Sequence, residues 1–159
     1  MKLIIAQHNE NVSWSDGYDR FIVKKGEHLP NIGREPLSYM WYIINFYDEL
    51  DGMYIFTQAN PFAHCKDFKE FIDGNPKSFT WVSDLSDLVC DNYGSPHDSN
   101  LEIDKFLTNC GLEPKDMYTF NAGCLFSISA EEIKRKPKEY YEKVFEALTL
   151  TCLSVCSMS

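Results

Sequence analysis

The alternation of helix and strand patterns is clearest in residues 36–57, which read PLSYMWYIINFYDELDGMYIFT. Pro36 suits the first position of a helix, because its missing N–H would have no partner there. Apolar residues then recur at helical spacing, at Leu37, Met40, Trp41, Ile44 and Tyr47. The turn residues Asp51-Gly52 end this helix, and residues 53–57 follow as a strand that Asn60-Pro61 stops. This stretch therefore predicts a helix followed directly by a strand.

The same alternation continues on both sides of this stretch. Short apolar strands are predicted before it, at residues 2–6 and 21–23. After it the patterns predict a helix at 66–72, a strand at 79–82 and a helix at 101–110 that Gly111 caps. Strand-like segments follow within residues 118–128. A last helix begins with the capping box Ser129–Glu132, and Pro137 interrupts or restarts it. The sequence therefore predicts an α/β fold, with residues 1–159 forming a single domain around a mostly parallel sheet flanked by helices.

Composition limits the classes of partner. The chain has 159 residues, with 24 acidic and 15 basic side chains and a net charge of −9. Such a chain is not expected to bind nucleic acid or an anionic membrane, because binding to either requires clustered Lys and Arg side chains. No apolar run is long enough for a membrane span or a signal peptide. The six cysteines form no CxxC pair, so reduced thiols and a cytoplasmic location are expected.

Ligands of such sheets bind beyond the carboxyl ends of the strands. Polar residues cluster at these places: Gln7-His8-Asn9-Glu10 with Trp14, then Gln58-Ala59-Asn60 with His64 and Asp67, and later Asn121-Ala122-Gly123. The first cluster could hold a base or ribose or form a plain polar turn, and Trp14 could stack on a base or pack in a core. His64 and Asp67, at helical i, i+3 spacing, could ligate a metal with His8 or Glu35 or lie on an ordinary helix surface.

A further cluster, Asn31-Ile32-Gly33-Arg34-Glu35, precedes the first long helix. Backbone N–H groups and the helix dipole favour an anion at such a helix start, and the Arg34 guanidinium matches a phosphate or carboxylate. The alternative is that Arg34 pairs with a surface glutamate while Gly33 only turns the chain. The pattern alone favours this alternative, because such turns are common. The phosphate-binding motifs GxGxxG and GxxxxGK[ST] are absent, as are GxSxG and HExxH.

Several of these motifs, in their order and spacing, resemble a little-characterised family. The residues that carry the likeness are His8-Asn9-Glu10 with Trp14, Asn31-Ile32-Gly33-Arg34-Glu35 with Tyr39, residues 42–50, Phe56-Thr57-Gln58-Ala59-Asn60-Pro61-Phe62 with His64, and residues 121–129 with Ile133, Pro137 and Tyr141. The family is a domain of unknown function in fungi, bacteria and large DNA viruses that is often called glycosyltransferase-like. The likeness extends from about residue 3 to residue 148.

The resemblance implies a nucleotide-sugar-binding fold of the GT-A type. It assigns nucleotide-sugar binding to His8, Asn9, Glu10, Trp14, Asn31, Gly33, Arg34, Gln58, Asn60 and Asn121, and offers Glu35, His64 and Asp67 as candidates for the general base. The partners would be a nucleotide sugar and a carbohydrate acceptor, with a divalent cation, Mn or Mg, as the expected cofactor. The sequence departs from this pattern where Gln58-Ala59-Asn60 stands in place of an Asp-x-Asp motif.

Three hypotheses follow. The leading one is a glycosyltransferase in which Arg34 and the helix amides stabilise the departing diphosphate. The second is a non-catalytic carbohydrate- or nucleotide-binding module, which the missing Asp-x-Asp and the short Ser/Thr/Cys-rich segment 149–159 favour. The third is a metal-dependent hydrolase that uses His8, His64 and Asp67.

Overall fold

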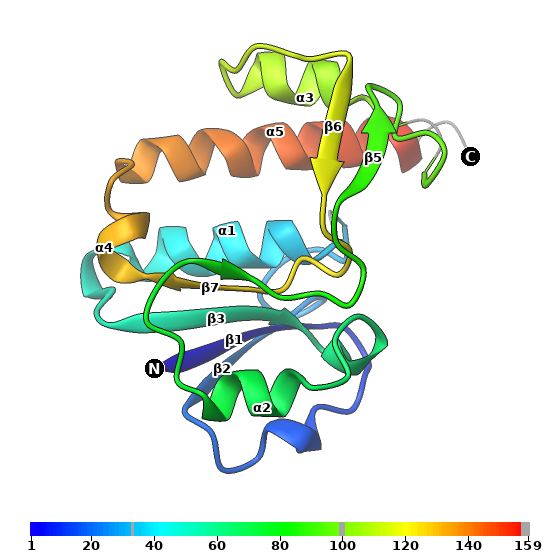
Figure 1. Cartoon of the computed structure of the whole chain (residues 1–159). Helices are drawn as coiled ribbons and strands as arrows, with labels where there is room; N and C mark the ends of the chain where they lie inside the picture. The colour runs from blue at the N-terminus through cyan, green and yellow to red at the C-terminus, as the bar shows by residue number, and fades with distance from the viewer. Residues whose placement is uncertain (33, 99–100, 157–159) are drawn as a thin grey trace.

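The structure, a computed structural model, describes residues 1–32, 34–98 and 101–156 (Figure 1). The strands are β1 (Lys2–Gln7), β2 (Arg20–Lys24), β3 (Met53–Gln58), β4 (Thr80–Trp81), β5 (Leu88–Asp91), β6 (Met117–Phe120) and β7 (Phe126–Ser129). The α-helices are α1 (Arg34–Phe46), α2 (Phe68–Asp73), α3 (Ile103–Asn109), α4 (Ala130–Ile133) and α5 (Lys138–Cys156). Short 3-10 turns lie at Ser13–Ser15, Tyr47–Glu49 and Pro61–Ala63.

Five strands form one mixed sheet in the order β2-β1-β3-β7-β4, while β5 and β6 form a separate antiparallel pair. The α/β class is confirmed, but the sheet is not mostly parallel. Strand β1 is parallel to β2 and β3, whereas β7 is antiparallel to both β3 and β4. The difference arises within residues 118–128, where Gly123 and Cys124 take left-handed backbone angles between β6 and β7. The chain turns there between β6 of the small sheet and β7 of the large sheet, where β7 pairs antiparallel with β3.

The side-chain alternation of β1 divides the core into two parts. Successive side chains of a strand point to opposite faces. Ile4 and Ala6 therefore join the cluster beneath α1 and α5, while Leu3 and Ile5 join the cluster beside α2. Figure 1 shows the corresponding layers, with α1 and α5 on one side of the large sheet and α2 on the other. Both faces of β1 are thus buried.

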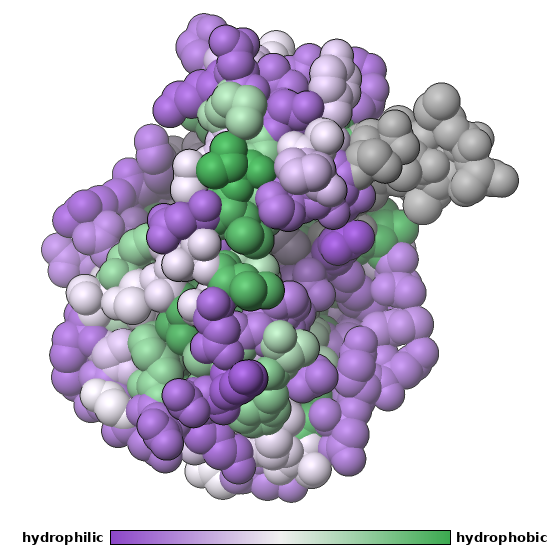
Figure 2. Space-filling model, turned by 45° about the vertical axis from the view of Figure 1, so that its right-hand side comes forward, coloured by the Kyte–Doolittle hydropathy of each residue, from purple (hydrophilic) through white to green (hydrophobic). Residues whose placement is uncertain are grey.

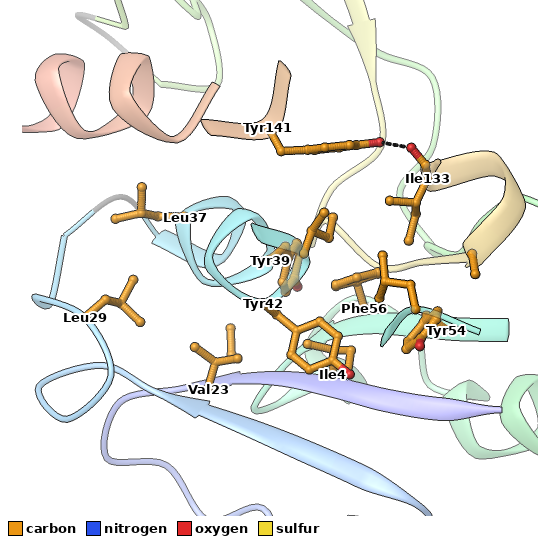
Figure 3. Packing of buried hydrophobic residues seen from close by; sticks show 14 residues of the cluster. Ile4, Val23, Leu29, Leu37, Tyr39, Tyr42, Tyr54, Phe56, Ile133 and Tyr141 are labelled. Carbon is orange, nitrogen blue, oxygen red and sulfur yellow. Dashed lines mark hydrogen bonds between the residues drawn. The ribbon is translucent and has the colours of Figure 1, made fainter. Parts of the chain in front are cut away.

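Helix α1 lies between the sheet and α5, and both of its long faces are covered. Tyr39 and Tyr42 pack towards the ring of Phe56 in β3, with ring centroids 5.2 and 6.3 Å from it. Figure 3 shows these rings in the same cluster as Ile4 and Val23. The predicted apolar residues Met40, Trp41 and Ile44 are only partly buried, at the margin of this cluster.

Two hydrogen bonds fix the start of the C-terminal region. Half of the predicted capping box is confirmed, because the N–H of Glu132 donates to Ser129 Oγ over 3.1 Å, whereas the Glu132 carboxylate pairs with Arg135. The hydroxyl of Tyr141 donates to the carbonyl of Ile133 over 2.7 Å, and this bond ties α5 to α4 (Figure 3). Pro137 lies between the two helices, and α5 begins at the residue that follows it.

Strands β5 and β6 form an outer layer together with α3, which packs against α5. The sequence did not predict β5. Among the described residues of this layer, Cys90 and Cys110 are buried, while Val89 and Met117 are about half exposed at 44% and 55%. Figure 2 shows apolar side chains reaching an otherwise largely hydrophilic surface. The outer layer therefore has little core of its own.

Candidate functional site

Two clusters that are separate in the sequence meet at one edge of the large sheet. Because β1 and β2 are parallel, their carboxyl ends lie at the same edge. The end of β1 and the turn after it, together with residues that follow β2 and the start of α1, line a cavity of about 200 Å³. We call it the β1–α1 cavity. Its lining consists of Ala6, Gln7, His8, Glu10, Lys25, Asn31, Arg34 and Glu35.

The turn after β1 is organised by Glu10. Its Oε2 accepts hydrogen bonds from the backbone N–H groups of His8, at 2.8 Å, and Asn9, at 3.1 Å. Gln7 Nε2 donates to the Glu10 carbonyl over 2.7 Å. Burial raises the pKa of the Glu10 carboxyl, but the backbone donors outweigh burial and hold this pKa below its ordinary value. Glu10 thus remains an anion that shapes the turn.

Arg34 begins α1 and carries the positive charge expected there. Its backbone has a φ of 45°, a left-handed angle that is uncommon for a residue with a side chain. Its side chain is 83% exposed and pairs loosely with Asp98, with an N–O separation of 3.7 Å. Such an exposed pair contributes little to stability and can exchange for another anion. Gly33, predicted to bind beside Arg34, lies outside the described residues.

Glu35 lies between this cavity and the connection from β6 to β7. It lines the β1–α1 cavity, and its charge also acts on Cys124. Burial, followed by the charge of Glu35, raises the pKa of the Cys124 thiol to about 12. The Cys124 carbonyl accepts a hydrogen bond from Tyr39 Oη over 3.2 Å, which joins this connection to α1. The Cys124 thiol is therefore protonated at neutral pH and is a poor nucleophile.

Cys124 also lines a second cavity, of about 330 Å³, together with Trp81, Asp87, Thr119, Phe120 and Asn121. We call it the Trp81 cavity. Asn121 is the one predicted site residue here, and its Oδ1 accepts a hydrogen bond from the Asp87 N–H over 3.1 Å. Sequence reasoning selected neither Trp81 nor Asp87 as a site residue. The signal that could have identified Trp81 is the Phe79-Thr80-Trp81 alternation, which puts two large rings on one face of a short strand.

The predicted residues after β3 do not line either cavity. Gln58 Nε2 donates to the carbonyl of Asn60 over 2.8 Å, closing a local turn. His64 and Asp67 do not share a helix, because His64 ends the turn Pro61–Ala63 and Asp67 precedes α2. His64 packs beneath Gly123, and its Nδ1 is buried without a hydrogen-bond partner among the described residues.

Trp14 and Asn9 also lie apart from the cavity lining. Trp14 packs edge-on against Phe62 and Phe68, with ring centroids at 5.5 and 5.8 Å, and its Nε1 donates to the Ala59 carbonyl. The tryptophan thus packs in the core beside α2, which was the alternative to stacking on a base. Asn9 Nδ2 lies 3.2 Å from His8 Nδ1, within the exposed turn.

The described part of the chain contains no group of three or more His, Cys, Asp or Glu side chains positioned to hold a metal ion. His8, His64 and Asp67 all belong to that part, and they do not form a ligand set. Within the same part, every helix is too short or too polar to cross a membrane. Comparison with protein-family models, curated proteins and solved structures gives no match to this chain.

Proposed function

We propose that this protein binds a nucleotide sugar through its diphosphate at the β1–α1 cavity and transfers the sugar to a hydroxyl acceptor, in a fold of the GT-A type. The observation that carries the proposal is the convergence of His8 and Glu10 with Asn31, Arg34 and Glu35 around one cavity. His8 and Glu10 precede β2 in the sequence, and the other three residues follow it. The parallel pairing of β1 and β2 brings the two groups together. The site lies where open α/β sheets bind their ligands.

The size of the cavity favours the diphosphate rather than the whole nucleotide, and its lining sets Lys25 and Arg34 against the carboxylates of Glu10 and Glu35. A volume of about 200 Å³ is below the range of about 300–1,000 Å³ that is usual for larger ligands. Arg34 provides a planar donor group, and the start of α1 provides backbone N–H groups with the positive end of the helix dipole. The base and ribose would then lie outside the cavity, along the exposed turn at His8 and Asn9.

In the proposed reaction the acceptor hydroxyl oxygen attacks the anomeric carbon. The bond from that carbon to the diphosphate oxygen breaks, and the diphosphate leaves with the electron pair. Arg34 and the α1 N–H groups stabilise the negative charge on this leaving group. The hydroxyl proton passes to a carboxylate, and Glu35 is the best placed of the three candidates because it alone lines the cavity. The described residues offer no cluster for a divalent cation, so no step is assigned to one.

The test is a thermal-shift panel of nucleoside diphosphates and sugar nucleotides, each with and without manganese. A ligand that binds only the folded protein raises its melting temperature. Arg34→Ala is expected to remove the shift while leaving the melting temperature of the free protein nearly unchanged. Arg135→Ala is the matched control, because Arg135 is a similarly exposed arginine paired with Glu132 on α4. If no nucleotide shifts the wild type, or if Arg34→Ala shifts normally, the proposed anion site is wrong.

The second candidate is a binding module without turnover. Gln58 and Asn60 favour it, because amides stand where a carboxylate motif is expected and Gln58 is engaged in its own turn. Release of nucleoside diphosphate from a bound sugar nucleotide in the presence of glycan acceptors separates the two candidates. A transferase releases it, and Glu35→Gln retains nucleotide binding but loses release. A module binds the nucleotide and releases nothing, even as the wild type.

A further inference from the structure

The Trp81 cavity lies at the junction of the two sheets. Trp81 comes from β4, the edge strand of the large sheet, while Thr119 and Phe120 come from β6 of the small one. Asp87 precedes β5, and Asn121 and Cys124 belong to the connection that links β6 to β7. Its volume of about 330 Å³ falls within the range of small-molecule sites.

Trp81 gives this cavity an accessible aromatic surface. Its side chain is 47% exposed, although large aromatic rings normally bury most of their area. The ring is held in place by neighbours, with the centroid of Phe126 at 5.1 Å and that of Phe79 at 5.5 Å. Both contacts are edge-on or nearly so, at interplanar angles of 61° and 84°. The Trp81 ring is therefore held in position by its aromatic neighbours, and its exposed surface is available to a flat ligand.

Two polar side chains complement this ring. Asn121 uses Oδ1 to accept from the Asp87 N–H, and no hydrogen bond among the described residues uses its Nδ2. One Asp87 oxygen, Oδ2, accepts from Ser86 Oγ over 3.1 Å, and Oδ1 takes part in no described hydrogen bond. The cavity thus offers one amide donor and one carboxylate acceptor beside an aromatic ring. The carboxylate disfavours phosphate and other anionic ligands.

Strained backbone surrounds the same cavity. Asp87 and Cys124 have φ angles of 56° and 52°, left-handed values that cost energy for residues with a Cβ atom. Such strain persists where the surrounding structure enforces it, and it concentrates at functional sites. Here it orients Asp87 and the chain beside Asn121. Arg34, which lines the β1–α1 cavity, shows the same left-handed angle.

We infer that the Trp81 cavity binds a neutral sugar residue of a glycan. A pyranose ring has an apolar C–H face that matches an aromatic ring, and hydroxyl groups at its edge that both donate and accept hydrogen bonds. Trp81 packs against the apolar face, while Asp87 and Asn121 form hydrogen bonds with the hydroxyl groups. This binding rests on the cavity alone. Its role as the acceptor site rests on the proposed function. Helix α1 links the two cavities, because its Glu35 lines the first and its Tyr39 hydroxyl donates to the carbonyl of Cys124, which lines the second.

The test uses saturation-transfer NMR with four neutral trisaccharides: cellotriose, maltotriose, mannotriose and chitotriose. At least one is expected to bind the wild type with a Kd of about 10 mM or tighter. Trp81→Ala is expected to weaken that binding at least about tenfold, whereas Trp81→Phe retains most of it. Trp81→Leu is a second disruptive variant that keeps apolar packing on Phe126. Tyr93→Ala is the control, since Tyr93 is 64% exposed and does not line the cavity.

The inference is overturned if none of the four trisaccharides binds, or if Trp81→Ala and Trp81→Leu bind as the wild type does. Its failure is distinct from failure of the nucleotide site. Arg34→Ala is expected to retain trisaccharide binding, and Trp81→Ala is expected to retain the nucleotide-induced thermal shift. If each substitution removed both activities, the two ligands would share one site and the assignment to the Trp81 cavity would be wrong.

Discussion

The two cavities differ in the structure that supports them. The β1–α1 cavity lies at the end of β1, a strand that is buried on both faces, since every residue from Leu3 to Ala6 is inaccessible to solvent or nearly so. The Trp81 cavity instead rests on the two exposed residues of β4, on β6 and on a loop with left-handed backbone. The first cavity is thus supported by the main core. The second depends on how an outer layer docks against the sheet, so it is expected to open at a lower free energy.

The largest expected effect is a difference in stability between substitutions in the main core and in the outer layer. Phe56 is fully buried at the centre of the main core, so Phe56→Ala should destabilise the protein by about 3–5 kcal/mol. Met117 in β6 is 55% exposed, and Met117→Ala should change stability by no more than about 0.5 kcal/mol. Urea denaturation of both variants measures this contrast. Equal losses would show that the outer layer has a stabilising core of its own.

The next effect concerns the loop that carries Asn121. A Cβ added to Gly123 would lie 2.6 Å from the Cβ of His64, at a φ of 87°. Gly123→Ala should therefore cost about 2 kcal/mol and weaken trisaccharide binding, with the nucleotide site intact. Gly26→Ala is the matched control, because Gly26 has a φ of 89° and no atom within 4 Å of an added Cβ. If both variants lose the same stability, backbone strain alone accounts for the cost and His64 is not a rigid neighbour.

A smaller effect of opposite sign is expected at the β1–α1 cavity. Glycine adopts a φ of 45° without steric cost, so Arg34→Gly should stabilise the free protein by about 0.5–1 kcal/mol. The same change removes the guanidinium and should abolish the thermal shift with nucleoside diphosphates. Differential scanning fluorimetry with and without ligand measures both. A destabilised Arg34→Gly variant would mean that the pair with Asp98 contributes more than its exposure suggests.

The smallest effect depends on pH. The folded pKa of Glu10 is below its ordinary value, so its contribution to stability is present above about pH 4.3 and is lost as the pH falls through the folded pKa. Glu10→Gln should therefore be less stable than the wild type at neutral pH, by a small amount because the group is exposed. The two proteins should converge in acid. A difference that stays constant from pH 7 to pH 3 would assign the effect to packing instead.

The sequence predicted the elements whose signals are local. Spacing and cap chemistry predict the strands β1, β2 and β3, the helix at Pro36 and the helix start at Ser129, and the structure confirms each within a few residues. The predicted end of α1 was less accurate, because residues 47–49 continue as a 3-10 turn. The strand β5 was not predicted, since its partner, β6, lies far along the chain.

Much of the candidate site depended on pairing that no local pattern reveals. His8 and Arg34 meet because β1 and β2 are parallel. The rule that ligands bind at strand ends pointed to His8, whereas Arg34 was selected for its place at a helix start. The antiparallel register of β7 sets its first residue, Phe126, beside Phe56 near the carboxyl end of β3, and Asn121, five residues earlier, lines the Trp81 cavity and not the β1–α1 cavity. His64 and Asp67 were grouped by helical spacing, but a turn ends between them and the helix begins only at Phe68.

The position of β7 between β3 and β4 has a consequence for synthesis on the ribosome. One edge of β3 lacks its partner until residues 126–129 have been made, and α1 lacks its cover until α5 follows. The nascent chain therefore exposes an unpaired strand edge and the aromatic side chains of α1 for most of its translation. Such surfaces attract chaperones or other nascent chains, so slow elongation before residue 126 should lower the yield of native protein.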